Sequence, residues 1–418
     1  MINTIQKIPL DDSARVATII ASAYPGFELF SEEKKTRFEE IFTQVQNEEP
    51  TTNYYGLYKQ ENLVGLMRLH DFKMNLLSTM ADVGGIGLVA VDLLHKKENV
   101  AKEMLTYFLT HYKEKEASMV SLYPFRVDFY KKMGFGVGPK MDQYRVKPDS
   151  FPKGRSKEHI ERLNINDKNE LLACYNRYLF QTAGMIEKTE SELNQLFNRP
   201  ENHVYAYREG DKILGYIVFS FKRASTSNFV LNDMVIKEWI YETPDALSEM
   251  MTFLHSQADQ INRIELQTQD ESFHILLSDP WNDADHVIPP VYRESHTTGV
   301  GLMYRVIDTE NFFRTLKDHD FGNQTCRVKF TIADSFFSDN NRSVVVHFEK
   351  GQPSIDSLGE YEVEVSLDVS DFSSLVMGAV TFKSLFNYGL VQISDESYLP
   401  ALHSLLYREQ KPRCTTVF

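Results

Sequence analysis

The sequence predicts a mixed α/β and α+β fold, in which two copies of one α/β unit are followed by a separate α+β domain. An internal repeat predicts the first part, because residues 55–65 recur as residues 205–215 with an offset of 150 at every position. The last part of the chain places strand-like alternations before helical patterns, an order typical of α+β domains. A length of 418 residues is too long for one ordinary domain and agrees with this division.

Each copy of the repeat is predicted to be a β-hairpin, since apolar strand-like segments flank a short polar turn. A helical pattern precedes each hairpin, at residues 11–24 in the first copy and 167–179 in the second. We therefore expect two α/β domains, at residues 1–148 and 157–293. The linker between them is expected at residues 147–154, which are rich in Pro, Gly and Ser.

The third domain is expected at residues 300–418. Its predicted strands lie at residues 325–332, 342–349 and 361–369, and its predicted helices at residues 371–377, 381–386 and 398–406. Proline-containing segments near residues 280 and 289 mark the transition into this domain.

The overall charge argues against nucleic acid as a partner. Lys and Arg number 45 against 59 Asp and Glu, for a net charge of −14, whereas phosphate binding needs a basic face. An acidic surface is compatible with a cationic substrate, although solvated acidic faces are the commoner explanation.

Cysteine and histidine usage favours a cytoplasmic protein without a metal centre. The three cysteines are far apart and form no disulfide framework, and the 12 histidines show no metal-ligand spacing. The N-terminus lacks the basic segment and following apolar run of a signal peptide. No apolar run reaches the roughly 18 residues of a membrane span. We expect no membrane partner.

Residues 84–102 have the order of a pyrophosphate site. A glycine-led apolar strand, Gly84-Gly85-Ile86-Gly87, continues to Val91 and is followed by a basic turn and an amphipathic helix. The free amides and the positive dipole end of a helix N-terminus attract anions. Lysines at the start of a helix more often belong to a solvated surface turn. The order of strand, basic turn and helix nevertheless favours a coenzyme A acyltransferase.

Tyr130 is the best candidate for a catalytic acid. It falls on a short predicted helical turn that Met133-Gly134-Phe135 closes, after a second strand. A thiolate leaving group takes a proton from a phenol when the two are positioned together. Without other evidence, a tyrosine that is surrounded by apolar residues in the sequence is more often part of the hydrophobic core.

These segments resemble the GCN5-related N-acetyltransferase (GNAT) superfamily and, within it, the Eis (enhanced intracellular survival) family. The matching stretches are residues 85–91, 95–101 and 122–135, and the three-part layout also matches. The resemblance implies two tandem GNAT-like domains followed by a sterol-carrier-protein-like domain. It also implies acetyl-CoA as cosubstrate, small cationic amines such as aminoglycosides as acceptors, and a homo-oligomer.

The resemblance implies roles for individual residues. The strand that pairs with the pantetheine arm would consist of Val89, Ala90 and Val91. The pyrophosphate loop would consist of Lys97, Glu98, Asn99, Val100, Ala101 and Lys102. Phe125 and Arg126 would lie near the cofactor. Tyr130 falls on the family's general acid. Phe418 falls on the terminal residue whose α-carboxylate is the general base.

The loop departs from the family pattern of arginines followed by glycine, since it reads Lys96-Lys97-Glu98-Asn99. Asn is the non-glycine residue best able to adopt a left-handed conformation, so the turn itself can be kept. Lysine offers a point charge in place of the bidentate arginine fork, and Glu98 repels phosphate unless it points away. We expect weaker cofactor binding than in a glycine-containing relative.

The second copy lacks a basic loop, because an acidic and bulky turn follows its equivalent strand at residues 238–244. This copy is predicted to be degenerate. On the acceptor side, residues 24–30 provide aromatic side chains and Glu28, which suit a cationic amine.

Two other functions stay open at this stage. A lipid- or ligand-binding protein would use the third domain, and an acyl-CoA sensor would bind the cofactor without turnover.

Overall fold

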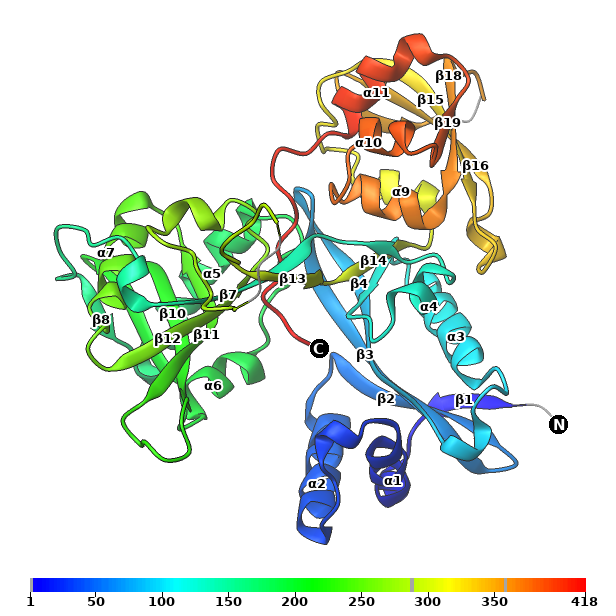
Figure 1. Cartoon of the computed structure of the whole chain (residues 1–418). Coiled ribbons are helices and arrows are strands. Elements are labelled where there is room, and N and C mark those ends of the chain that lie inside the picture. The colour runs from blue at the N-terminus through cyan, green and yellow to red at the C-terminus, as the bar shows by residue number, and fades with distance from the viewer. Residues whose placement is uncertain (1–2, 286–288, 357–358) are drawn as a thin grey trace. The chain divides into compact units, whose positions relative to one another are not determined.

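The computed structural model describes residues 3–285, 289–356 and 359–418 and contains three β-sheets (Figure 1). The first sheet has the order β1 (Thr4–Lys7), β2 (Thr52–Lys59), β3 (Asn62–Leu76), β4 (Thr79–Val91), β5 (Met119–Leu122), β14 (Met303–Val306) and β6 (Gly136–Val137). The second has the order β13 (Thr297–Val300), β7 (Lys140–Val146), β12 (Ile261–Thr268), β11 (Asn232–Tyr241), β10 (Lys212–Arg223), β9 (His203–Glu209) and β8 (Ile160–Arg162). The third has the order β17 (Gln352–Ile355), β16 (Ser343–Glu349), β15 (Cys326–Ala333), β18 (Val363–Asp368) and β19 (Val391–Ile393).

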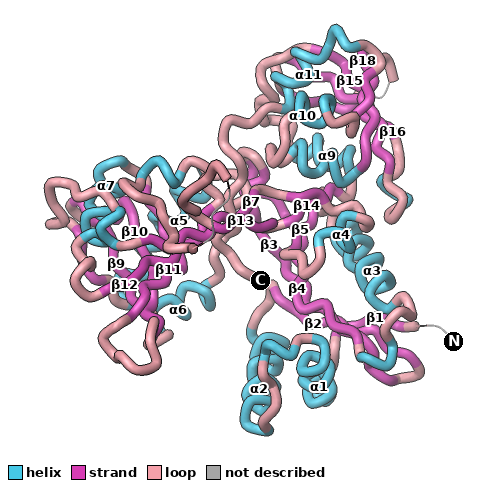
Figure 2. The backbone as a smooth tube through the Cα atoms, in the orientation of Figure 1, coloured by secondary structure: helices cyan, strands magenta, loops and turns pink. Residues whose placement is uncertain are grey.

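Helices accompany each sheet, as the cyan segments of Figure 2 show. Those of the first are α1 (Ser13–Ala23), α2 (Glu32–Glu48), α3 (Val100–Glu114) and α4 (Val127–Lys131). Those of the second are α5 (Lys168–Gln181), α6 (Glu190–Asn198) and α7 (Pro244–His255). Those of the last part of the chain are α8 (Thr309–Thr315), α9 (Val369–Val376), α10 (Phe382–Asn387) and α11 (Leu399–Leu406). None of the described helices is both long enough and apolar enough to cross a membrane.

The predicted fold class is confirmed. The repeat forms two antiparallel hairpins, β2 with β3 and β9 with β10. In both copies the strand after the hairpin then pairs in parallel with the strand that follows a helix, β4 with β5 and β11 with β12. In the last part of the chain, β15, β16 and β18 and then α9, α10 and α11 form at the predicted positions, within a few residues.

The chain forms two compact units, and each unit contains segments that are separated in the sequence. Residues 1–138, 302–410 and 417–418 make the first unit, and residues 139–301 and 411–416 make the second. Accordingly β7, which lies inside the predicted first domain, pairs with β12 of the second sheet, whereas β14 pairs with β5 of the first. The sheets therefore take strands from beyond the predicted boundaries.

The first sheet buries both of its faces. One face packs against α3, through Met104, Leu105 and Phe108, and the other against α1 and α2, through Ile20 and Phe42. A sheet covered on both faces receives ligands at its strand edges or at the ends of its strands. The shape of β4 along its edge therefore decides where a ligand can bind.

Candidate active site

Strand β4 separates from β5 partway along its length. The parallel pairing with β5 ends at Ile86, opposite Leu122, while β4 continues to Val91. The β3–β4 register shifts at this point, and Leu88 has a φ of 47°, so β4 contains a bulge there. The edge from Gly87 to Val91 is thus left without β5 as a partner and can accept hydrogen bonds from an extended ligand.

The glycines before the bulge make room for bulky neighbours. A Cβ atom on Gly84 would collide with the Tyr112 ring, and one on Gly85 with the Phe72 ring. At Gly87 a Cβ atom would lie 3.2 Å from the carbonyl carbon of Phe418. These glycines therefore shape the strand for aromatic rings and for the end of the chain.

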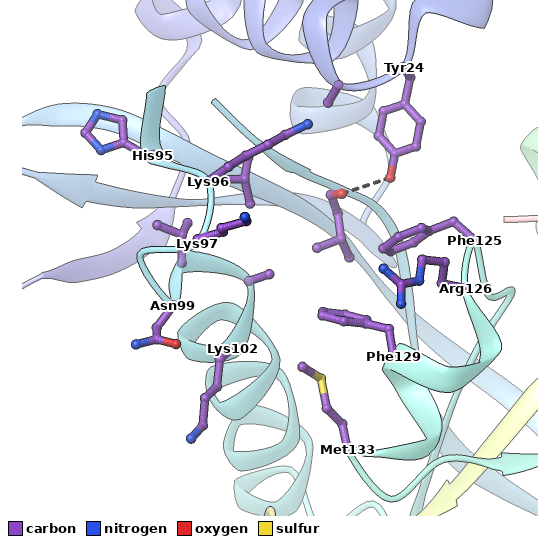
Figure 3. A pocket seen from close by; sticks show the side chains of 15 residues that line it. Tyr24, His95, Lys96, Lys97, Asn99, Lys102, Phe125, Arg126, Phe129 and Met133 are labelled. Carbon is purple, nitrogen blue, oxygen red and sulfur yellow. Dashed lines mark hydrogen bonds between the residues drawn. The ribbon is translucent and has the colours of Figure 1, made fainter. Parts of the chain in front are cut away.

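A cavity of about 710 Å³ lies beside the unpaired edge of β4 (Figure 3). It is lined by Ala23, Tyr24, Val89, Val91, His95, Lys96, Lys97, Asn99, Val100, Ala101, Lys102, Phe125, Arg126, Phe129 and Met133. Basic side chains from the loop and from α3 lie at one side, and aromatic side chains at the other. A ligand that is anionic at one end and apolar at the other suits this division.

The basic loop forms a cradle in front of α3. Lys97 and Asn99 adopt left-handed conformations, with φ values of 68° and 63°, as the sequence predicted for Asn99. The Asn99 side chain does not cap the helix, so the amides of the first turn stay available to an anion. The loop therefore makes its two left-handed turns without glycine.

Glu98 turns away from the cavity. Its carboxylate binds Lys59 Nζ at 2.8 Å and His95 Nδ1 at 2.9 Å. These hydrogen bonds, with Lys59 contributing most, lower the pKa of Glu98. The expected repulsion of phosphate is thus reduced, because the negative charge is paired outside the cavity.

Tyr130 lies behind the aromatic wall. Its ring packs edge-on against Phe125, Phe129 and Phe135, and 3 % of the residue is exposed. Burial, with a smaller contribution from Tyr24, raises the pKa of Tyr130, so its hydroxyl stays protonated in neutral solution. The Tyr24 hydroxyl donates a hydrogen bond of 2.8 Å to the Val89 carbonyl, shown as the dashed line in Figure 3.

The turn that carries Tyr130 depends on Gly134. This residue has a φ of 81°, and a Cβ atom there would overlap the Arg305 guanidinium. Arg305 is fully buried and pairs with Asp334 at 2.8 Å. The glycine that closes the predicted turn is therefore required both by the backbone and by a buried ion pair.

Phe418 lies against β3 and β4. Its ring contacts Phe72, Tyr123 and His70, with centroid separations of 4.7, 5.3 and 5.5 Å. Its carboxyl group lies at Gly87, where Arg68 Nη2 would also come within 3.8 Å of a Cβ atom. The terminal carboxyl group thus meets a glycine that leaves it space and a nearby guanidinium.

A neutral histidine orients this arginine. Arg68 Nε donates to His70 Nε2 at 3.0 Å, so the ring proton of His70 belongs on Nδ1, which lies 3.1 Å from Thr52 Oγ1. Burial and the charge of Arg68 lower the pKa of His70 well below its ordinary value. Arg68 and His70 are not among the residues predicted from the sequence, although their spacing places both on one face of a strand.

The structure gathers most of the predicted cofactor residues in one place. All except Ala90 and Glu98 line the cavity. The Ala90 side chain belongs to the core beneath α1 and α2, which leaves its backbone on β4. Tyr130 and Phe418 are in the same unit as the cavity but are not among its lining residues.

Three family models match successive parts of the chain. An acetyltransferase (GNAT) domain matches residues 4–138, a second acetyltransferase (GNAT) domain matches residues 184–306, and a sterol carrier protein domain matches residues 312–415. The same three-part fold is found in Eis1 from Mycobacterium abscessus, with a TM-score of 0.75 and 16% identity over all of both chains. The chain therefore carries two GNAT acetyltransferase domains and a sterol carrier protein domain, in the three-part fold of Eis1.

Two other solved structures share this Eis-like fold over all of both chains. They are a GCN5-related N-acetyltransferase from Anabaena variabilis (TM-score 0.81, 16% identity) and a probable N-acyltransferase from Enterococcus faecalis (TM-score 0.78, 17% identity). A comparison with curated proteins finds no match. The two acetyltransferase domains indicate that the protein is an acetyltransferase, and GNAT domains use acetyl-CoA as their cosubstrate.

Proposed function

We propose that this protein acetylates amine groups of small cationic acceptors, using acetyl-CoA bound in the first domain. One observation carries the proposal: a strand edge freed by a bulge and an uncapped basic helix N-terminus line the same cavity. The second copy has the freed strand but no basic loop. The acidic turn predicted at residues 238–244 is wrong, because β11 continues through Tyr241 and only Glu242 and Thr243 separate it from α7. The first domain is therefore the proposed catalytic one.

The residues of the cavity fit the parts of acetyl-CoA. The backbone of Val89, Ala90 and Val91 suits the amides of the pantetheine arm, and the first-turn amides of α3, together with Lys97 and Lys102, suit the pyrophosphate. Phe125 and Arg126 border the same space. When bound, acetyl-CoA supplies a thioester whose carbon–sulfur bond is exchanged for a carbon–nitrogen bond.

Tyr130 and Phe418 are the proposed acid and base. The Phe418 carboxylate accepts a proton from the attacking amine, and the Tyr130 hydroxyl donates one to the departing sulfur. The raised pKa of Tyr130 keeps that proton in place until it is needed. Proton transfer is thus balanced, since one proton is taken up and one is released in each turnover.

The acceptor is proposed to enter beside Tyr24. Aromatic side chains at this end of the cavity suit a cationic amine, and the net charge of −14 favours the approach of cations. Glu28, the predicted acceptor carboxylate, is mostly exposed and binds Lys34 at 2.9 Å. It therefore serves long-range attraction better than direct binding.

Acetylation of an amine panel tests the proposed function. The purified protein is incubated with acetyl-CoA and with polyamines, aminoglycosides or lysine peptides, and each product is identified by its mass. We expect acetylated products from the cationic amines and none from neutral alcohols of similar size. Binding of acetyl-CoA without product from any amine would favour an acyl-CoA sensor and contradict the proposal.

Replacing Lys97 with alanine is expected to weaken acetyl-CoA binding roughly ten- to a hundredfold, because a charged hydrogen bond to phosphate contributes roughly 1.5–3 kcal/mol. The value of kcat should be retained at saturating cofactor, since Lys97 is remote from the reacting bond. Calorimetric titration with acetyl-CoA measures the change. Lys73→Ala, at an exposed site on β3, is the matched control and should bind as the unaltered protein does.

We propose a homo-oligomer in the cytoplasm, without nucleic acid as a partner. The three buried thiols, Cys174, Cys326 and Cys414, suit a reducing compartment. Light scattering of the purified protein measures the number of subunits, and a monomer would contradict the oligomer.

A further inference from the structure

The second domain repeats the strand separation of the first. The parallel pairing of β11 with β12 ends at Ile236, opposite Leu266, while β11 continues to Tyr241. Ile236 follows Ile86, where the β4–β5 pairing ends, by the same offset of 150 that relates the two hairpins. The second copy therefore also has a strand edge without its parallel neighbour.

The chain's own segment 411–416 contacts both strands just beyond the end of their pairing. The Cys414 amide donates a hydrogen bond of 2.6 Å to Gln269 Oε1, immediately after β12. The Thr415 hydroxyl donates one of 3.1 Å to Glu238 Oε1, on β11. The segment thus lies where β11 and β12 separate, which corresponds to the point where β4 separates from β5 in the first domain.

Other residues of the second unit hold the earlier part of this segment. The Arg413 amide donates to the Ala183 carbonyl at 2.8 Å, and Arg413 Nη2 binds Asp270 Oδ2 at 2.9 Å. Lys411 binds Glu271 at 2.7 Å. Gly184 leaves the necessary space, because a Cβ atom there would lie 2.8 Å from the Arg413 carbonyl oxygen.

The contacts are buried and their charges are matched. Cys414 and Thr416 are 4 % and 5 % exposed. Glu238, which receives Thr415, also binds Lys188 at 3.1 Å, and both side chains are almost completely buried. Buried polar groups are costly unless they are paired, so these residues specify one conformation of the segment.

We propose that the second domain is a clamp for the C-terminal segment, and that Gln269 and Asp270 are positioning residues for Phe418. The catalytic part of this inference rests on the proposed function. Segment 411–416 belongs to the second unit, and Val417 and Phe418, the next residues in sequence, belong to the first. Holding Thr416 leaves a tether of two residues, whereas a free segment would begin after α11 at Leu406. A shorter tether keeps the carboxyl group at a higher effective concentration.

Alkylation of Cys414 measures the clamp without using enzyme activity. The Gln269→Leu variant removes the acceptor of the Cys414 amide, and Asp270→Asn removes the charge that Arg413 binds. We expect peptide mapping to show Cys414 alkylated at least tenfold faster in both variants, with Cys174 unchanged as an internal reference. Gln267→Leu, two residues earlier on β12 and exposed, is the matched control and should leave Cys414 protected.

Turnover by the same variants tests the positioning role. We expect Gln269→Leu to lower kcat about tenfold, with the affinity for acetyl-CoA unchanged. Equal alkylation of Cys414 in Gln269→Leu, Asp270→Asn and the unaltered protein would overturn the clamp. Faster alkylation of Cys414 with undiminished kcat would overturn the positioning role. If even the unaltered protein showed no turnover, the proposed function would be refuted, and the clamp would be supported by alkylation alone.

Discussion

The Tyr130→Phe variant is expected to turn over at least about a hundredfold more slowly, because a positioned general acid contributes roughly 10²–10⁴ to the rate. Its affinity for acetyl-CoA should be unchanged, since the remaining ring still packs against Phe125, Phe129 and Phe135. Steady-state kinetics give kcat, and calorimetry gives the affinity.

Two further measurements sharpen this prediction. Tyr107→Phe, on α3, removes a hydroxyl from a partly buried tyrosine outside the cavity lining and should keep full activity. The pKa of Tyr130 is raised, so its acid form persists as the pH rises, and ionisation of Tyr130 should cause no loss of activity up to about pH 10. Unchanged kcat in Tyr130→Phe would rule out its acid role.

Adding three residues after Phe418 is expected to lower kcat at least about a hundredfold, because it replaces the proposed base with a neutral peptide group. The affinity for acetyl-CoA should persist, since Phe418 does not line the cofactor cavity. The same three residues added before Met1 are the control and should leave turnover unchanged.

Gly87→Ala tests the same carboxylate without altering the end of the chain. The new Cβ atom would lie 3.2 Å from the Phe418 carbonyl carbon and 3.4 Å from its oxygen, so the carboxyl group must shift. We expect a smaller loss of kcat, about tenfold, with folding retained. Gly299→Ala, on β13, has open space around its Cβ position and serves as the control. Full activity of the protein with three residues added after Phe418 would refute Phe418 as the base.

Much of the fold follows from local patterns in the sequence. The repeat at residues 55–65 and 205–215 predicted both hairpins, because alternating apolar residues around a polar turn can bury one face only in that arrangement. The strands and helices of the last part of the chain were predicted for the same reason. The basic turn before α3 was likewise visible as a change from a strand pattern to lysines and then to a helical pattern.

The glycines of β4 show where sequence reasoning stopped. The sequence predicts that they belong to a phosphate site, whereas Gly84 and Gly85 accommodate the rings of Tyr112 and Phe72, and Gly87 accommodates Phe418. Glu98 was expected to repel phosphate unless it turned away, and it binds Lys59, which is 39 residues distant in sequence. Such contacts depend on how strands are registered, which no local pattern specifies.

The sequence by itself determined the order of the domains, the hairpins, the left-handed Asn99 and the basic loop that only the first copy retains. These features depend on neighbouring residues, whose spacing and conformational preferences are local. Only the tertiary structure decided which strands complete each sheet, where β4 leaves β5, how Arg68 and His70 come to lie beside Phe418, and that the second domain holds segment 411–416. The physical reason is that these contacts join residues far apart in the chain, and their energies depend on burial and pairing that exist only after folding.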